Sequence, residues 1–93
     1  MSDETTGLKM KSNTAGSVTL SWDATGDAQK YRVYRYDNAS GSYKYVKSVT
    51  GTSYTDKNLA AGQVYQYKVR GQWTIGGTNY YSGYSNVLSA VTL

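Results

Sequence analysis

The chain has 93 residues, a mass of 10.2 kDa and a formal net charge of +4, which is enough for one domain with a single small core. It contains no cysteine and no histidine. The sequence therefore excludes disulfides, thiolate zinc sites and the side chain that most often serves as general base near neutral pH.

Charge and hydropathy exclude two further classes of partner. The basic residues are dispersed along the chain rather than clustered, which argues against a nucleic-acid partner. No apolar stretch approaches the roughly 18 residues that a membrane helix needs, which argues against a membrane partner. Met1 leads directly into polar residues rather than a signal peptide, so the chain is either cytosolic or part of a longer exported protein. The absence of cysteine fits the exported protein slightly better.

The expected elements are all β-strands, because apolar and polar residues alternate repeatedly and no window keeps a helical period. Residues 1–6 are expected to form a flexible tail, and residues 7–93 a single domain. Strands are expected at residues 8–11, 17–22, 30–36, 43–49, 53–55, 64–74 and 85–92. Seven strands at this spacing are typical of an antiparallel β-sandwich.

Two glycine-containing segments specify the C-terminal part of this pattern. Gly76-Gly77, between Thr74-Ile75 and Thr78-Asn79, predicts a two-residue hairpin, because both central residues of such a turn need positive φ. This hairpin would place Trp73 opposite Tyr80. Ser82-Gly83 is expected to interrupt the strand that follows, as a β-bulge.

Four motifs, in order, resemble those of a fibronectin type III domain of the kind found in bacterial multidomain exported and cell-surface proteins. They are SVTLSW at 17–22, YRVYR at 31–35, LxxGxxYxYxV at 59–69 and YSN at 84–86. The resemblance covers residues 7–93 and implies a seven-stranded, immunoglobulin-like β-sandwich. It also implies a structural core made of Val18, Leu20, Trp22, Tyr31, Val33, Leu59, Tyr65, Tyr67, Val69 and Leu88.

The resemblance assigns two local features and leaves one position unusual. Leu59 and Tyr65 would flank a tyrosine corner, in which the Tyr hydroxyl bonds to a backbone group upstream. Arg35 stands where an inward aromatic residue is common in the family. We expect Arg35 to reach water at the end of its strand rather than pair with a carboxylate such as Asp37. The Arg-Gly-Asp sequence by which some relatives engage integrins is absent.

The outward face of the strands at 30–36 and 64–74 is the first candidate binding surface. Alternation places six aromatic, amide and cationic side chains on it: Arg32, Tyr34, Tyr36, Gln66, Lys68 and Arg70. Tyrosine rings flanked by donors would suit a sugar or a protein partner. The alternative, which we prefer, is a purely structural face in which Arg side chains cover the Tyr rings in cation–π pairs.

The predicted hairpin is the second candidate surface, with Trp73, Tyr80 and Tyr81 as a carbohydrate platform. Trp73 also follows the alternation of Tyr65 and Tyr67, which would turn it inward to close the end of the core. We prefer the inward position.

These observations predict a protein that is not an enzyme and that needs no cofactor. Asp23, Asp27 and Asp56 are too few and too scattered for a catalytic carboxylate pair, and the same scarcity argues against a metal site. The resemblance to fibronectin type III domains implies an accessory module that acts as a spacer or presentation domain within a larger extracellular or cell-surface protein, and we expect it to be monomeric in isolation. Its partners would be the neighbouring domains. The alternative is a carbohydrate- or protein-binding module that uses the Tyr/Arg/Lys face.

Overall fold

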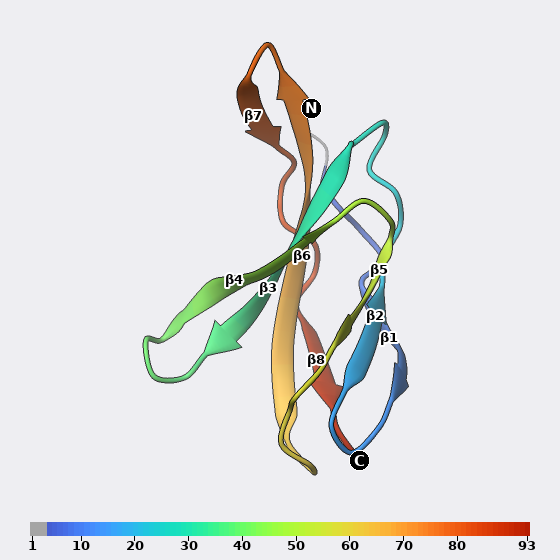
Figure 1. Ribbon diagram of the computed structural model, residues 1–93, viewed down its shortest axis with the longest axis vertical. Coiled ribbons are helices and arrows are strands. Elements are labelled where there is room, and N and C mark those ends of the chain that lie inside the picture. The colour runs from blue at the N-terminus through green and yellow to red at the C-terminus, as the bar shows by residue number, and fades with distance from the viewer. Residues whose placement is uncertain (1–3) are drawn as a thin grey trace.

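The computed structural model describes residues 4–93, which form a sandwich of two antiparallel sheets (Figure 1). The smaller sheet has the order β1-β2-β5, and the larger has the order β4-β3-β6-β7, with β8 also pairing with β6. The strands are β1 (Lys9–Asn13), β2 (Val18–Ser21), β3 (Lys30–Asp37), β4 (Ser42–Val49), β5 (Ser53–Asp56), β6 (Val64–Ile75), β7 (Thr78–Tyr81) and β8 (Leu88–Val91). The predicted all-β sandwich is confirmed.

Residues 4–93 form eight strands rather than the seven expected, because the last part of the chain pairs with β6 twice. Gly76 and Gly77 have φ of 59° and 81° and close a two-residue turn between β6 and β7, and Trp73 faces Tyr80 as predicted. After β7 the ladder is interrupted. It continues only through single bonds, such as the one from the backbone N–H of Ser85 to the carbonyl of Val69 (2.7 Å), before β8 begins.

The core lies between the sheets and follows the alternation of the strands. In β2, Val18 and Leu20 are fully buried, whereas the residues between and after them are half-buried. Seven of the ten predicted core residues are buried, namely Val18, Leu20, Trp22, Tyr31, Val33, Tyr67 and Val69. The other three, Leu59, Tyr65 and Leu88, are partly buried and pack against that cluster.

The structure packs residues 4–6, which the sequence assigned to a flexible tail; residues 1–3 of that tail lie outside the described residues. Glu4 forms a parallel bridge with Gly83. Thr5 is 1% exposed, and its hydroxyl forms hydrogen bonds with the hydroxyls of Thr25 (2.7 Å) and Ser82 (3.1 Å). The segment is held by hydroxyl groups and backbone hydrogen bonds rather than by apolar burial, so hydrophobic alternation could not predict its packing.

The molecule is elongated, with extents of 43 × 27 × 19 Å. In Figure 1, β1 and β8 both run downward, so the chain enters β1 near the middle and leaves β8 at the lower end, close to the C-terminus. Hydrogen bonds tie the two strands together at both ends. Leu8 is bonded to the side-chain amide of Asn86 through both its N–H and its carbonyl, and the Leu93 N–H donates to the Thr14 carbonyl.

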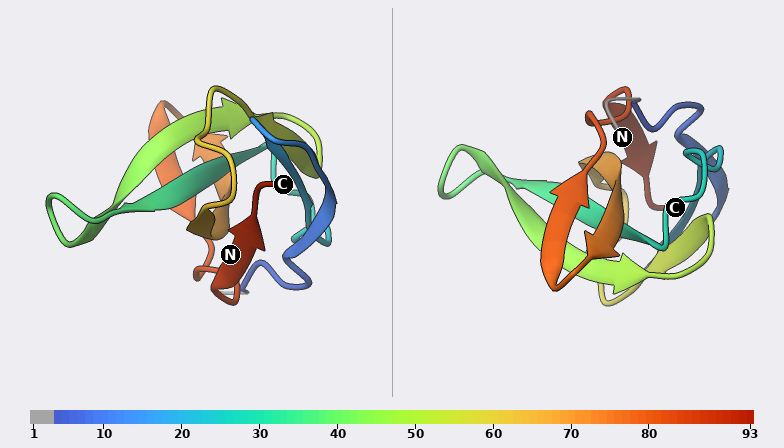
Figure 2. Two further views of the ribbon diagram at one scale, coloured as in Figure 1. Left: turned by 90° about the horizontal axis from the view of Figure 1, so that it is seen from below. Right: turned by 90° about the horizontal axis from the view of Figure 1, so that it is seen from above.

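The β3–β4 hairpin extends beyond the rest of its sheet. Seen along the long axis from either end, it projects away from the two sheets (Figure 2). The pairing between β3 and β6 stops at Arg35 and Tyr67, whereas the pairing between β3 and β4 continues to Asp37 and Ser42. The sheet is therefore forked beyond Arg35.

Candidate functional site

The outer face of the larger sheet brings together most of the residues predicted for a binding surface. Arg32 lies opposite Arg70, and Tyr34 opposite Lys68, on β3 and β6. β4 and the segment after β6 contribute further tyrosines. We call this surface the tyrosine–cation face and define it by Arg32, Tyr34, Tyr43, Tyr45, Lys68, Arg70, Tyr81 and Tyr84.

Arg32 is held among three tyrosines. Its guanidinium carbon lies 4.2 Å from the ring centroid of Tyr45, and its Nη1 donates to the Tyr81 hydroxyl at 3.2 Å. Burial lowers the pKa of Arg32, but the bond to Tyr81 and the neighbouring Tyr hydroxyls outweigh this and raise the pKa above its ordinary value. Its Nε is buried and, within the described residues, has no acceptor.

Arg70 and Lys68 repeat this arrangement along β6. Arg70 donates from both Nε and Nη2 to the Tyr34 hydroxyl, at 3.1 and 2.9 Å, and its guanidinium lies 4.0 Å from the Tyr81 ring centroid. The Lys68 ammonium lies 3.8 Å from the ring centroid of Tyr84 and 4.5 Å from that of Tyr43. Cations and rings thus alternate across the face, each cation held by the electron-rich faces of rings.

The rings of this face differ in exposure. Tyr34, at its centre, is 7% exposed and meets Tyr45 and Tyr84 edge-on at centroid distances of 6.3 and 5.3 Å. Tyr45 and Tyr84, which flank it, are 50% and 37% exposed. The covered centre fits the structural interpretation preferred from the sequence. The open rings on both sides were not predicted.

Tyr36 and Gln66, two of the six predicted face residues, lie at the fork rather than at the centre of the face. Tyr36 packs edge-on against Tyr43 with a centroid distance of 5.3 Å. Both Tyr36 and Gln66 line an open groove of about 490 Å³ between β3 and β6, with Gln63 and Tyr65. The fork explains their position, because β3 and β6 no longer pair there.

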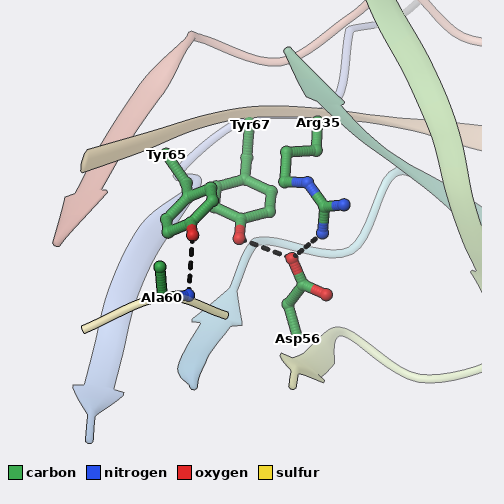
Figure 3. A network of polar contacts seen from close by, with 5 residues as sticks. All are labelled: Arg35, Asp56, Ala60, Tyr65 and Tyr67. Atoms are coloured by element: carbon green, nitrogen blue, oxygen red, sulfur yellow. Dashed lines mark hydrogen bonds and ion pairs between the residues drawn. The ribbon is translucent and has the colours of Figure 1, made fainter. Parts of the chain in front are cut away.

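Arg35 corrects a prediction. We expected it to reach water, but it takes the alternative of pairing with a carboxylate, and the partner is Asp56 rather than Asp37. Arg35 Nη1 forms an ion pair with Asp56 Oδ2 at 2.6 Å (Figure 3). The Tyr67 hydroxyl donates to the same oxygen, also at 2.6 Å. Asp56 is 3% exposed, so its carboxylate needs both partners. Burial, together with the bond to Asp56, raises the pKa of Tyr67 well above its ordinary value.

The tyrosine corner is present beside this network. The backbone N–H of Ala60 donates to the Tyr65 hydroxyl at 2.9 Å (Figure 3). Leu59, the other residue predicted for the corner, packs against the core. The corner and the ion pair together fix the loop between β5 and β6 to the larger sheet.

The predicted hairpin platform is not assembled. Trp73 is 6% exposed, and its Nε1 donates to Asp27 Oδ1 at 2.8 Å, so its ring is not available to a sugar. Tyr80 is 43% exposed, whereas the Tyr81 hydroxyl is engaged by Arg32. Trp73 is therefore buried, as the preferred interpretation expected.

Within residues 4–93, no group of three or more acidic side chains is placed to hold a metal ion. The same residues include no helix of the length and apolarity needed to cross a membrane.

Comparisons with known proteins agree with this architecture. A family model described as "Fibronectin type III domain" matches residues 3–88. The chain is 44% identical to a poly(3-hydroxybutyrate) depolymerase of Ralstonia pickettii over 64 residues, which are 69% of this chain and 12% of that protein. It is 37% identical to exoglucanase B of Cellulomonas fimi over 86 residues, 92% of this chain and 8% of that protein. The chain thus spans about a tenth of the length of each relative.

A solved structure shows the same fold at low sequence identity. The fibronectin type III domain of human fibronectin type III domain containing protein 3 superposes with a TM-score of 0.77 at 18% identity. The match covers 96% of this chain and 84% of that one. At this identity the likeness concerns the fold alone.

Proposed function

Because the chain belongs to the fibronectin type III family, we propose that it is a non-catalytic accessory module that sets the distance and orientation of neighbouring domains in a larger exported enzyme. The observation that carries this proposal is that the chain corresponds to only a small part of the length of each bacterial relative. Most of this chain aligns with 12% of a depolymerase and 8% of an exoglucanase. The polymer-degrading activity of such a protein would reside in its other domains, outside the cell.

The shape of the domain supports a spacing role. One elongated sandwich with a shared core transmits position better than a flexible linker, since its two ends cannot move independently. The bonds of Leu8 to Asn86 and of Leu93 to Thr14 hold the beginning of β1 and the end of β8 at fixed places on the sandwich.

Two of the acidic side chains, Asp27 and Asp56, are occupied in structural roles, which supports a non-catalytic function. Asp56 accepts bonds from Arg35 and Tyr67, and Asp27 accepts one from Trp73. A pair of carboxylates at catalytic separation would need both to face a cleft. These two acids instead stabilise buried donors.

A domain exchange tests the spacing role. In the Ralstonia pickettii depolymerase, the matching segment is replaced either by this chain or by a flexible Gly/Ser linker of equal length. We expect both proteins to hydrolyse a small soluble ester equally, and only the protein with this chain to retain activity on the solid polymer. Equal activity of the two on the solid polymer would contradict a role in positioning.

Binding through the tyrosine–cation face is a second candidate function. One observation favours it: Arg32, Lys68 and Arg70 lie together, and none of them pairs with an acidic side chain among residues 4–93. In the part of the chain that the structure describes, the only ion pair joins Arg35 and Asp56, which lie outside this face. A surface that carries three cations opposed only by neutral rings has charge left for a ligand.

A further inference from the structure

We propose that the tyrosine–cation face binds an acidic polysaccharide, whose carboxylates pair with Arg32, Lys68 and Arg70. This inference rests on the second candidate function and names its ligand class. It does not depend on the spacing role, which the domain exchange measures separately.

The tyrosine–cation face carries positive charges close together. Arg32 and Arg70 are direct partners across β3 and β6, and like charges in that position repel. Both guanidinium carbons lie within 6 Å of the same two rings, at 5.7 and 5.4 Å from Tyr34 and at 5.7 and 4.0 Å from Tyr81. The rings attract each cation but carry no net charge, so the repulsion persists until an anion binds.

Several donor groups of the three cations make no hydrogen bond to residues 4–93. Arg32 donates through Nη1 and Arg70 through Nε and Nη2. Arg32 Nη2, Arg70 Nη1 and the Lys68 ammonium make no hydrogen bond to the described residues, and all three side chains are partly exposed. Carboxylate oxygens are acceptors that form short, charge-assisted bonds with such donors.

The exposed tyrosine rings of the face favour a polysaccharide over other anions. Tyr45 and Tyr84, the most exposed rings of the face, lie on opposite sides of Tyr34. A tyrosine ring offers a flat apolar surface on which the C–H face of a sugar can stack. Neighbouring strands lie about 4.8 Å apart, so β4, β3 and β6 spread rings and cations over about 10 Å. An open surface with both features suits an extended chain of charged sugars.

The experiment is a titration of the isotope-labelled 93-residue chain with alginate oligosaccharides, followed by amide NMR shifts and by calorimetry. We expect saturable shifts confined to β3, β4, β6 and residues near Tyr84, and weaker binding at higher salt. The double variant Arg32→Gln/Arg70→Gln should lose about tenfold in affinity. The control Lys9→Gln/Lys11→Gln removes the same charge from exposed positions of β1, on the other sheet, and should bind as the unmodified chain does.

Two further variants keep the test informative if the double variant unfolds. Lys68→Gln removes a cation that makes no hydrogen bond to any residue from 4 to 93, and Tyr45→Ala removes an exposed ring. Each should weaken binding while leaving the thermal midpoint nearly unchanged. Neutral dextran should not bind. No binding of alginate, or an equal loss in the β1 control, would overturn the proposed site. Equal affinity for polyglutamate, dextran sulfate or single-stranded DNA would overturn the assignment to carboxylated sugars.

Discussion

Arg70 donates two hydrogen bonds to the hydroxyl of Tyr34, which lies on the neighbouring strand β3 at the centre of the tyrosine–cation face. The Tyr34 ring is almost fully covered, while its hydroxyl serves as the acceptor for a charged donor. Tyr34 therefore stabilises the face in two ways: its ring is buried, and its hydroxyl holds Arg70 in place.

The Tyr34 hydroxyl can be removed without removing the ring. We expect Tyr34→Phe to lower the free energy of unfolding by about 1–2 kcal/mol, because a hydrogen bond to a charged donor is lost while the buried ring stays. Urea denaturation monitored by tryptophan fluorescence measures this change. The control is Tyr45→Phe, whose hydroxyl makes no bond within the described residues. A loss as large in the control would show that the bond to Arg70 contributes nothing specific.

The ion pair at Asp56 gives a larger expected effect. Asp56→Asn leaves the Arg35 charge without its counter-ion and weakens the acceptor of Tyr67. Breaking a fully buried pair costs about 3–5 kcal/mol; since the Arg35 side chain is 35% exposed, we expect about 2 kcal/mol after allowing for solvent screening. Chemical denaturation measures this loss. The control is Asp37→Asn, which changes a carboxylate that does not pair with Arg35. Equal losses in the two variants would contradict the assignment of the partner.

Tyr67 should make stability fall at alkaline pH. Its pKa is raised in the folded protein by burial and by the bond to Asp56, so the unfolded chain loses the Tyr67 proton first, near the ordinary tyrosine pKa of about 10. The stabilisation is complete below that pH and declines as the pH rises above it. Between pH 9 and 11, the free energy of unfolding should therefore fall less steeply in Tyr67→Phe than in the unmodified chain. Parallel pH profiles would exclude this role for Tyr67.

Thr5 tests whether the segment before β1 belongs to the fold. We expect Thr5→Val to lower the free energy of unfolding by about 1–2 kcal/mol, because the Thr25 and Ser82 hydroxyls lose a buried partner. Thr52→Val, at an exposed position, should change stability little. Thermal unfolding by circular dichroism compares the two. An unchanged midpoint in Thr5→Val would mean that residues 4–6 are not part of the cooperative unit.

Much of the fold could be predicted from the sequence because it depends on local patterns. Alternation located every strand except β7 and identified the buried side of β2, β3 and β6. Gly76-Gly77 specified the hairpin, since few other residues adopt positive φ twice in succession. The bond from Ala60 to Tyr65 followed from the resemblance to a known family.

Long-range pairing set the limit of the sequence prediction. The partner of Arg35 is 21 residues away, on β5 of the opposite sheet, and no local pattern joins the two. Likewise, the pairing of β3 with β4 shifts register between Val33 and Tyr34. That irregularity determines which tyrosines of β4 reach the tyrosine–cation face, and it left Tyr45 out of the predicted surface. Tyr43 and Tyr45 are two residues apart in the predicted strand at 43–49. This spacing places both rings on one face of the strand and could have indicated that they belong to the surface.

The alignment of β1 with β8 also determines how the domain would respond to force. Tension between flanking domains would pull the start of β1 and the end of β8 apart along the direction of both strands. The paired bonds of Leu8 with Asn86 and the bond of Leu93 to Thr14 would then be loaded together, in shear, rather than broken one after another. A domain tied in this way would resist stretching when its two ends are pulled apart.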